Sequence, residues 1–151
     1  MKLRIEIDPN QAEEVIIRAP AVTHEIRRIE EAVSKIIGQS GEIALKDGDS
    51  ERFVSYDELL FFETSEDKVW AHTSDDCYFC PMRLGELERA APLSFARASK
   101  GCLVNTALIR SISRSATGVG TASFTTSQKK VYISRMYYKK VRETIEETRL
   151  R

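Results

Sequence analysis

The sequence of 151 residues has few of the features that mark membrane-spanning, secreted or disulfide-linked proteins. No apolar run approaches the roughly 18 residues that a membrane-spanning helix needs. Charged residues begin at Lys2, which is too early for the apolar region of a secretory signal. Three cysteines are an odd number, and a chain of this length can bury a core without disulfides. These absences predict a reduced, cytoplasmic protein with one main domain and a small extra module.

Residues for catalysis or metal binding are also scarce. The two histidines are His24 and His72, and no nucleophile motif lies near either of them. Cys77-x-x-Cys80 has the spacing of half a zinc site, but it falls in an expected strand, where residues i and i+3 point to opposite faces. No second pair of ligands completes the site, so buried structural thiols are the preferred interpretation, and Cys102 is interpreted likewise. We therefore expect no enzyme, no metal, no other cofactor and no small-molecule substrate.

Acidic residues are missing from a long part of the chain. Residues 89–142 contain 11 Lys or Arg and no Asp or Glu, although the whole chain has 23 residues of each charge. Residues 1–88 have a net charge of −10, and residues 89–151 have a net charge of +10. This asymmetry predicts a polyanionic partner, above all a phosphate backbone. The alternative is a protein–protein interaction module without DNA, in which the acidic half of one copy binds the basic half of another.

Residues 1–40 are expected to form a module of two strands and a helix. Apolar and charged residues alternate from Lys2 to Asp8, as in a half-buried strand, and Val15–Ile17 is its expected partner strand. A helix follows, with Thr23 as its N-cap and Gly38 as its stop. The module is too small to bury a core alone, so it must dock on the rest of the chain or on another molecule. The apolar stripe of its helix consists of Ile26, Ile29, Val33 and Ile36.

From residue 41 onward, short apolar runs separated by turn residues predict an all-β body with small attached helices. Leu59–Phe62 is apolar throughout, as expected of a buried strand, and Phe95–Val104 is expected to be extended. A short helix is predicted near Leu84, and a last helix is predicted to begin after its N-cap, Ser134. Gly118-x-Gly120 predicts a hairpin turn, because no helix with a phosphate-binding lysine follows it. The predicted fold class is mainly β with small helices (α+β).

Two segments within the acid-free stretch carry most of its charge. The first lies between Phe95 and Asn105, on an extended element, and the second covers residues 129–140. At the start of the last helix, the free backbone amides after Ser134 and the side chain of Arg135 are expected to converge on a seat for a phosphate. Lysines one turn later extend this positive surface, so the two segments together suggest a two-point grip on a nucleic acid.

A series of short motifs runs from residue 41 to residue 147, and their order and spacing are more specific than any single motif. The motifs are Leu60-Phe61-Phe62-Glu63, Leu84-x-x-Leu87, Phe95-x-Arg97-x-Ser99-Lys100-x-x-Leu103-Val104-Asn105, Ile109, and Ser134-Arg135-x-Tyr137 with Lys139-Lys140. In this order they resemble the LytTR-type DNA-binding domain of bacterial transcription regulators. The resemblance implies an elongated body of several small antiparallel sheets. It also implies that loops, and not a recognition helix, read successive major grooves at paired half-sites of double-stranded DNA.

The same resemblance implies three DNA-contacting segments. The first follows the Phe-Phe-Glu strand, near Lys68. The second includes Ser99 and Lys100, with Arg97 either touching DNA or orienting the loop. The third lies at the start of the last helix, where Met136 stands in place of a second arginine found in many members. The expected DNA-binding residues are Lys68, Arg97, Ser99, Lys100, Ser134, Arg135, Met136, Lys139 and Lys140.

The usual companion of this domain is a phosphorylatable receiver, which needs roughly 110–120 residues. Residues 1–40 are too few for one, so the resemblance implies a free-standing regulator that acts as a homodimer. Residues 1–40 would then serve dimerisation or contact with a membrane-protein regulator, and residues 41–151 would bind DNA. A simple packing cap on the β body is the alternative role for residues 1–40.

Overall fold

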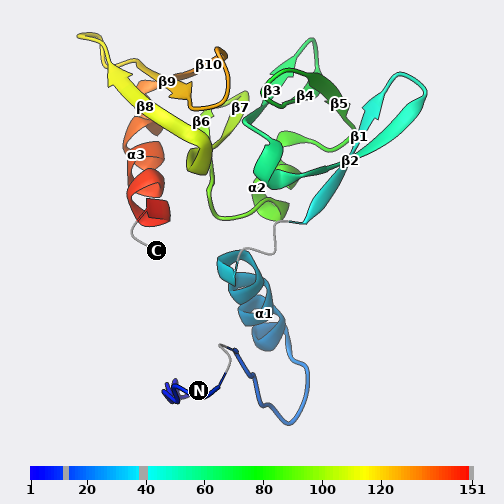
Figure 1. Ribbon diagram of the computed structural model, residues 1–151, viewed down its shortest axis with the longest axis vertical. Helices are drawn as coiled ribbons and strands as arrows, with labels where there is room; N and C mark the ends of the chain where they lie inside the picture. The colour runs from blue at the N-terminus through cyan, green and yellow to red at the C-terminus, as the bar shows by residue number, and fades with distance from the viewer. Residues whose placement is uncertain (12–13, 38–40, 150–151) are drawn as a thin grey trace. The chain divides into compact units, whose positions relative to one another are not determined.

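The structure is a computed structural model that describes residues 1–11, 14–37 and 41–149. Contacts divide the chain into two units, Met1–Val33 and Ser34–Arg151. Figure 1 labels their helices and strands. No described helix is long and apolar enough to cross a membrane.

The helix α1 (His24–Ile37) begins where the sequence predicts a helix. Thr23 is its N-cap, because the side-chain oxygen Oγ1 accepts a hydrogen bond of 3.2 Å from the backbone amide of Ile26. Glu25 lies in the first turn, where the helix dipole favours a negative charge. Three residues of the predicted apolar stripe are half-buried, whereas Ile36 is exposed. The predicted stop at Gly38 lies outside the described residues.

The two strands predicted before this helix are wrong. Residues 2–8 and 15–17 are both described, and neither forms a strand. A turn follows the first segment, where the backbone amide of Gln11 donates a hydrogen bond of 3.2 Å to the carbonyl of Asp8. A strand is stable only when its amides and carbonyls pair with a neighbour. The alternation in the sequence is real, but the described chain supplies no strand that pairs with it.

The larger unit is built on antiparallel strands, as its short apolar runs predicted. Seven of them form one sheet in the order β2-β1-β5-β4-β3-β7-β6. The short helix α2 (Leu84–Ala90) connects β5 to β6. The seven strands are β1 (Glu42–Asp47), β2 (Ser50–Ser55), β3 (Phe61–Ser65), β4 (Lys68–His72), β5 (Cys77–Cys80), β6 (Phe95–Ser99) and β7 (Cys102–Asn105).

The segment Phe95–Val104, expected to be extended, is a hairpin of two strands. β6 and β7 pair antiparallel, and the chain reverses at Lys100 and Gly101. The register shifts between Arg97 and Ser99, which is the mark of a β-bulge. Alternation of apolar residues alone does not reveal a reversal when the turn is as short as this one.

The strands β8 (Ile109–Arg114), β9 (Gly120–Phe124) and β10 (Lys130–Ile133) form a second sheet, in the order β10-β9-β8. The helix α3 (Arg135–Arg149) follows it directly. Tyr138 and Val141 are buried on the side of α3 that faces the core. The hairpin turn between β8 and β9 is confirmed, with Gly118 at φ +88°.

Two hydrophobic cores lie on opposite faces of β3 and β7. Phe62 and Leu103 belong to one core, with residues of β1, β4, β5 and α2, while Phe61 and Val104 belong to the other, with residues of the second sheet and α3. The strand predicted over Leu59–Phe62 begins only at Phe61, but Leu59 packs in the first core and Leu60 in the second, which explains why this run has no polar residue. The same arrangement fixes the small sheet and α3 against β6 and β7, next to the cation-rich segments.

Candidate nucleic-acid interface

Arg97 fixes the turn that carries Ser99 and Lys100. Its Nε donates to Oε2 of Glu88 on α2 at 2.6 Å, and its Nη1 donates to the backbone carbonyl of Lys100 at 2.6 Å. The Arg97 side chain is 19% exposed, so water screens these bonds only in part. The Lys100 side chain, in contrast, is exposed. Of the two roles expected for Arg97, this geometry favours the orientation of the loop.

The beginning of α3 lies directly beside this turn. The backbone amide of Ser134 donates a hydrogen bond of 2.8 Å to the carbonyl of Ala98 on β6. This bond brings Ser99 and Lys100 next to Arg135, although the two segments are far apart in the sequence. Arg135 is the first residue of α3 and is exposed. The structure therefore joins the second and third predicted contact segments into one surface.

The cap predicted for Ser134 does not form through its side chain. Its carbonyl accepts hydrogen bonds from the amides of Tyr137 and Tyr138, at 3.1 and 3.0 Å, but its hydroxyl is buried and has no hydrogen-bond partner among the described residues. The start of the helix is held instead by the backbone bond to Ala98. Ser134 is therefore a residue that positions Arg135 through its backbone.

The hairpin of β3 and β4 is the next neighbour along the same surface. The backbone amide of Thr64 donates a hydrogen bond of 2.8 Å to the carbonyl of Gly101. The tip consists of Glu66 and Asp67, at φ +52° and +62°, in the left-handed region that suits the tight turn of a hairpin. Lys68 follows at the start of β4 and is exposed. Lys68 thus reaches the surface, but it stands beside two carboxylates.

Arg114, which lies at the end of β8, is absent from the predicted DNA-binding residues. Its Nε donates to the carbonyl of Gly118 at 3.3 Å, and its guanidinium lies 4.7 Å from the centre of the Tyr138 ring. Gly118 also lies against Arg135, because a Cβ on Gly118 would stand 2.9 Å from Cδ of Arg135. The side chains of Arg114 and Arg135 therefore both lie beside Gly118. The available signal was an arginine at the base of a glycine-containing hairpin within the acid-free stretch.

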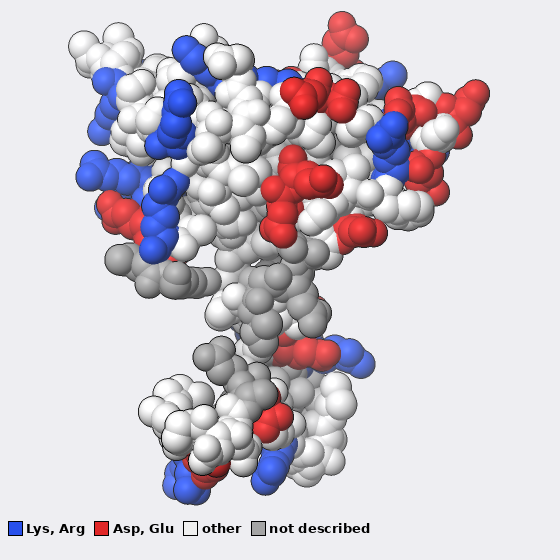
Figure 2. Space-filling model, viewed as in Figure 1, with Lys and Arg blue, Asp and Glu red and all other residues white. Residues whose placement is uncertain are grey.

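We refer to Ser99, Lys100, Arg114, Arg135 and Met136 as the cationic edge. Among the described residues, none of its three cations forms an ion pair with a carboxylate. In the larger unit, Lys and Arg gather over β8–β10 and α3, while Asp and Glu dominate over β1–β5 (Figure 2). The charge asymmetry of the sequence is thus an asymmetry of the folded surface as well.

Two lysines of α3 extend this positive surface beyond the cationic edge. Lys139 lies 3.9 Å from Glu143, but its side chain is 89% exposed, so the pair contributes little. Lys140 is exposed beside it. Both lysines remain accessible to a phosphate backbone.

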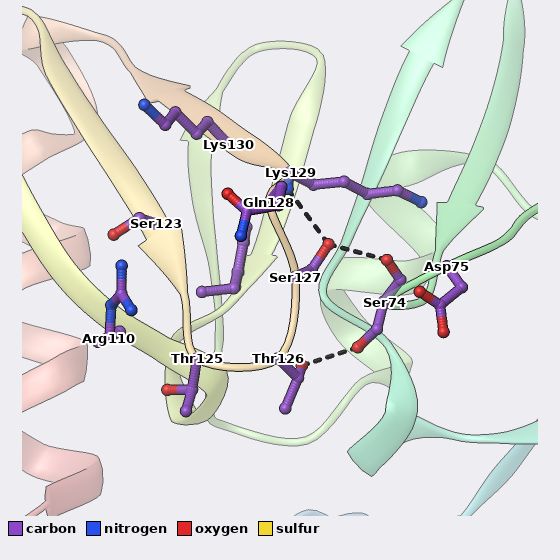
Figure 3. Close-up of a pocket in the computed structure, with 11 residues that line it drawn as sticks. Ser74, Asp75, Arg110, Ser123, Thr125, Thr126, Ser127, Gln128, Lys129 and Lys130 are labelled. Atoms are coloured by element: carbon purple, nitrogen blue, oxygen red, sulfur yellow. Dashed lines mark hydrogen bonds between the residues drawn. The ribbon is translucent and has the colours of Figure 1, made fainter.

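A polar groove lies beside the loop between β9 and β10 (Figure 3). Arg110, Ser123 and Lys130 line it from the small sheet. The loop itself is tied to the segment after β4, because Oγ of Ser127 donates to the carbonyl of Ser74 at 2.8 Å. These contacts hold the loop against the seven-stranded sheet and leave Arg110 and Lys130 exposed to solvent.

Lys129, next to Lys130, points the other way and is occupied within the fold (Figure 3). Its Nζ donates to the carbonyls of Asp76 and Thr73, at 2.7 and 3.0 Å, and lies 3.3 Å from Nδ1 of His72. The other ring nitrogen of His72, Nε2, lies 2.8 Å from Oε1 of Glu63.

Burial lowers the pKa of His72 from its usual value of 6.5. Glu63 opposes this effect, and the positive charge of Lys129 adds to it. A neutral ring then donates from Nε2 to Glu63 and accepts from Lys129 at Nδ1. His72 is half-buried, and through Lys129 it helps to hold the loop in place.

The cysteines confirm the expected faces of β5 but not the burial of both thiols. Cys80 and Cys102 are buried, whereas Cys77 is exposed on the opposite face of the strand from Cys80. Burial raises the pKa of Cys102 to about 12, so it is not a reactive thiolate. The part of the chain that the structure describes contains no group of three or more His, Cys, Asp or Glu placed to hold a metal ion.

The antiparallel sheets thus present hairpin turns and a helix start as one exposed cationic edge, which is typical of a nucleic-acid-binding domain. The family model described as the LytTr DNA-binding domain matches residues 49–146, which is more than half of the chain. The chain therefore belongs to the LytTr DNA-binding domain family. The predicted family, the predicted fold class of antiparallel sheets with small helices, and the predicted role of a DNA-binding transcription regulator are confirmed.

Several known proteins are similar to this chain over most of their length. A protein of Staphylococcus aureus strain NCTC 8325, named an HTH-type transcriptional regulator, is 27% identical over 146 residues, 96% of this chain and 98% of its own. Its counterpart in strain MRSA252 is 26% identical over the same coverage. The solved LytTr DNA-binding domain of a Bacillus cereus protein described as a methyl-accepting/DNA response regulator superposes with a TM-score of 0.64 at 21% identity, over 70% of this chain and 96% of that one. This likeness establishes the fold.

The name of the Staphylococcus relatives refers to a helix-turn-helix, which two consecutive helices would form. In this structure, the described helices α2 and α3 are separated by the five strands β6–β10. The cationic edge is accordingly made of hairpin turns and the start of one helix.

Proposed function

We propose that the protein regulates transcription in the bacterial cytoplasm as a homodimer that binds paired half-sites in double-stranded DNA. In each copy the cationic edge enters the major groove, and the protein performs no catalysis. The observation that carries this proposal is the 2.8 Å bond between Ser134 and Ala98, which sets Lys100 beside Arg135. The names of the Staphylococcus relatives support a role in transcription.

Side chains with different donor geometry have different tasks in this proposal. Arg135 is exposed and can bind O6 and N7 of guanine with two donors. Lys100 and Ser99 contact bases or phosphates from the β6–β7 turn. Arg114, although stacked on Tyr138, adds positive charge at the phosphate next to Arg135. The phosphate contacts outside the edge come from Lys68, Lys139 and Lys140.

Met136 brings an apolar side chain into this charged surface. It is 76% exposed in the first turn of α3, directly after Arg135. An exposed methionine gains from contact with an apolar group, and the major groove offers one in the 5-methyl group of thymine. Met136 is therefore expected to favour thymine at the position where many family members carry a second arginine.

The absence of acidic partners supports DNA as the ligand. Lys100, Arg114 and Arg135 are exposed and form no carboxylate ion pair within the described chain. Positively charged side chains that cluster on a surface repel one another. This repulsion is relieved when the phosphates of a DNA backbone bind beside them.

The test begins with selection of bound fragments from a random pool of duplex DNA, followed by titration of the selected site at several salt concentrations. Arg135→Ala and Lys100→Ala are compared with Lys46→Ala, a matched control at an exposed lysine of β1. Loss of a base contact weakens binding by about 1–3 kcal/mol, while the control binds as the parent does. Equal affinities of all four proteins, or no enriched sequence, would exclude this interface.

A further inference from the structure

The segment Lys2–Asp8 has the pattern of a strand but no partner in the described chain. Its apolar residues Leu3, Ile5 and Ile7 are 91, 78 and 91% exposed. Three exposed aliphatic side chains are unfavourable in water, and they favour a surface that covers them. Their alternation with charged residues is that of a strand with one face covered and one face in solvent.

The charges of this segment complement those of the same segment read backwards. Lys2 and Arg4 precede Ile5, and Glu6 and Asp8 follow it at the same distances. When two copies run antiparallel about a two-fold axis at Ile5, Lys2 of each copy faces Asp8 of the other, and Arg4 faces Glu6. Arg4 and Glu6 already lie on the same side of the segment, because they form an exposed ion pair of 2.9 Å.

We infer that two copies of this chain pair through Lys2–Asp8 as antiparallel strands centred on Ile5. Leu3 then faces Ile7 of the second copy, and the two Ile5 side chains meet on the axis. The apolar residues of both copies form one face, and the opposite charges form the other. This inference deepens the proposed homodimer, on which it rests, by naming its contact surface and its register.

The chain's own residues 14–18 are a poorer partner for this segment. They line a common hollow with it, yet neither segment is a strand. An antiparallel hairpin could keep the apolar residues together in two registers. One register opposes Glu6 to Glu14 and Lys2 to Arg18, and the other opposes Arg4 to Arg18. Like charges directly opposite each other destabilise a strand pair, so charge favours the second copy.

The charge pairing is tested with full-length protein, without DNA, by analytical ultracentrifugation at low-micromolar concentration. The parent is expected to be a dimer. Arg4→Glu and Glu6→Arg should each raise the dissociation constant by about tenfold or more, because each places like charges opposite each other. Arg18→Glu, a charge reversal in the same unit but outside the pairing, should leave the dimer intact.

Mixing the two single variants gives the decisive result. Each variant has lost the ion pair within its own chain, because positions 4 and 6 are both acidic in Arg4→Glu and both basic in Glu6→Arg. In a mixed pair, the two carboxylates of one variant face the two guanidinium groups of the other. The mixture should therefore form a heterodimer as stable as the parent dimer. A monomeric parent, dimeric single variants, or a mixture that stays monomeric would each overturn the inference.

The register is tested by disulfide trapping in a Cys77→Ser background, since Cys77 is exposed. Cα atoms opposite each other in an antiparallel pair are about 4.5–5.5 Å apart, within the range of a disulfide. Ile5→Cys alone should therefore cross-link to itself. Leu3→Cys should cross-link only when it is mixed with Ile7→Cys, and rapid self-linking of Leu3→Cys would overturn the register.

Failure of this inference and failure of DNA binding give different results. Arg4→Glu should bind a single half-site with parental affinity while losing the extra affinity for paired half-sites. Arg135→Ala should remain a dimer while losing affinity for both DNAs. Parental affinity of Arg4→Glu for paired half-sites would contradict the strand-paired dimer but not the cationic edge.

Discussion

Substitution of Arg97 by alanine tests which of two roles this residue has: positioning the turn between β6 and β7, or contacting DNA itself. The bond from Arg97 to the Lys100 carbonyl has a charged donor and is worth about 1.5–3 kcal/mol. The ion pair with Glu88, whose side chain is 48% exposed, adds about 0.2–1 kcal/mol. Arg97→Ala should therefore lower the free energy of unfolding by about 2–4 kcal/mol.

The effect of this substitution on DNA binding follows from the same contacts. Without Arg97, the backbone of Lys100 is no longer fixed, so affinity for DNA falls because the loop must be ordered on binding. No phosphate contact is lost, so the slope of log affinity against log salt stays as in the parent. Lys100→Ala should instead reduce that slope by about one while leaving stability nearly unchanged.

Both quantities are accessible with simple assays. The single tryptophan, Trp70 on β4, reports urea unfolding by fluorescence. Fluorescence anisotropy of labelled DNA at several salt concentrations gives the slope. Glu88→Gln is the matched control, and it should cost no more than about 1 kcal/mol. An Arg97→Ala protein with parental stability and a slope reduced by about one would refute the reasoning and make Arg97 a phosphate contact.

Three further predictions concern other parts of the larger unit. The pKa of His72 is lowered in the fold, so the unfolded chain binds a proton before the folded chain does as the pH falls below about 6.5. The free energy of unfolding should therefore decline below that pH. His72→Gln should flatten this decline in melting temperatures measured between pH 7.5 and 5. Gly120→Ala should cost about 1–3 kcal/mol in urea unfolding, because its Cβ would lie 2.5 Å from the Tyr138 ring, and a Tyr138→Leu background should reduce that cost. Replacement of the thymine read by Met136 with deoxyuridine, which lacks the methyl group, should weaken binding of the parent but not of Met136→Ala, and equal losses for both proteins would exclude that contact.

Most strands of the larger unit could be predicted because each is a short apolar run bounded by turn residues. The run Leu59–Phe62 was predicted to be buried, and the structure shows why, with a core on each face. The strands predicted for residues 2–8 and 15–17 are wrong, because a strand needs a neighbouring strand to pair with. The pattern of one segment does not show whether such a neighbour exists. Likewise, the sequence pattern of Phe95–Val104 does not show that the chain reverses direction at Lys100 and Gly101.

The candidate interface was predictable in composition but not in geometry. An acid-free stretch indicates a basic surface, yet it does not show that Ser134 bonds to Ala98 and so joins two distant segments. The carboxylate that holds Arg97 belongs to Glu88, which lies just before the acid-free stretch begins. Arg114 was missed because its role depends on a hairpin that returns it to the start of α3.

The central claim is that DNA binds across the cationic edge. Hydrogen–deuterium exchange of the full-length protein, with and without the selected duplex, tests this claim directly. Slower exchange on DNA binding is expected in residues 97–101, 114–119 and 134–140, and unchanged exchange is expected in β1, β2 and α2. Protection confined to β1, β2 and α2, with none at the start of α3, would contradict it.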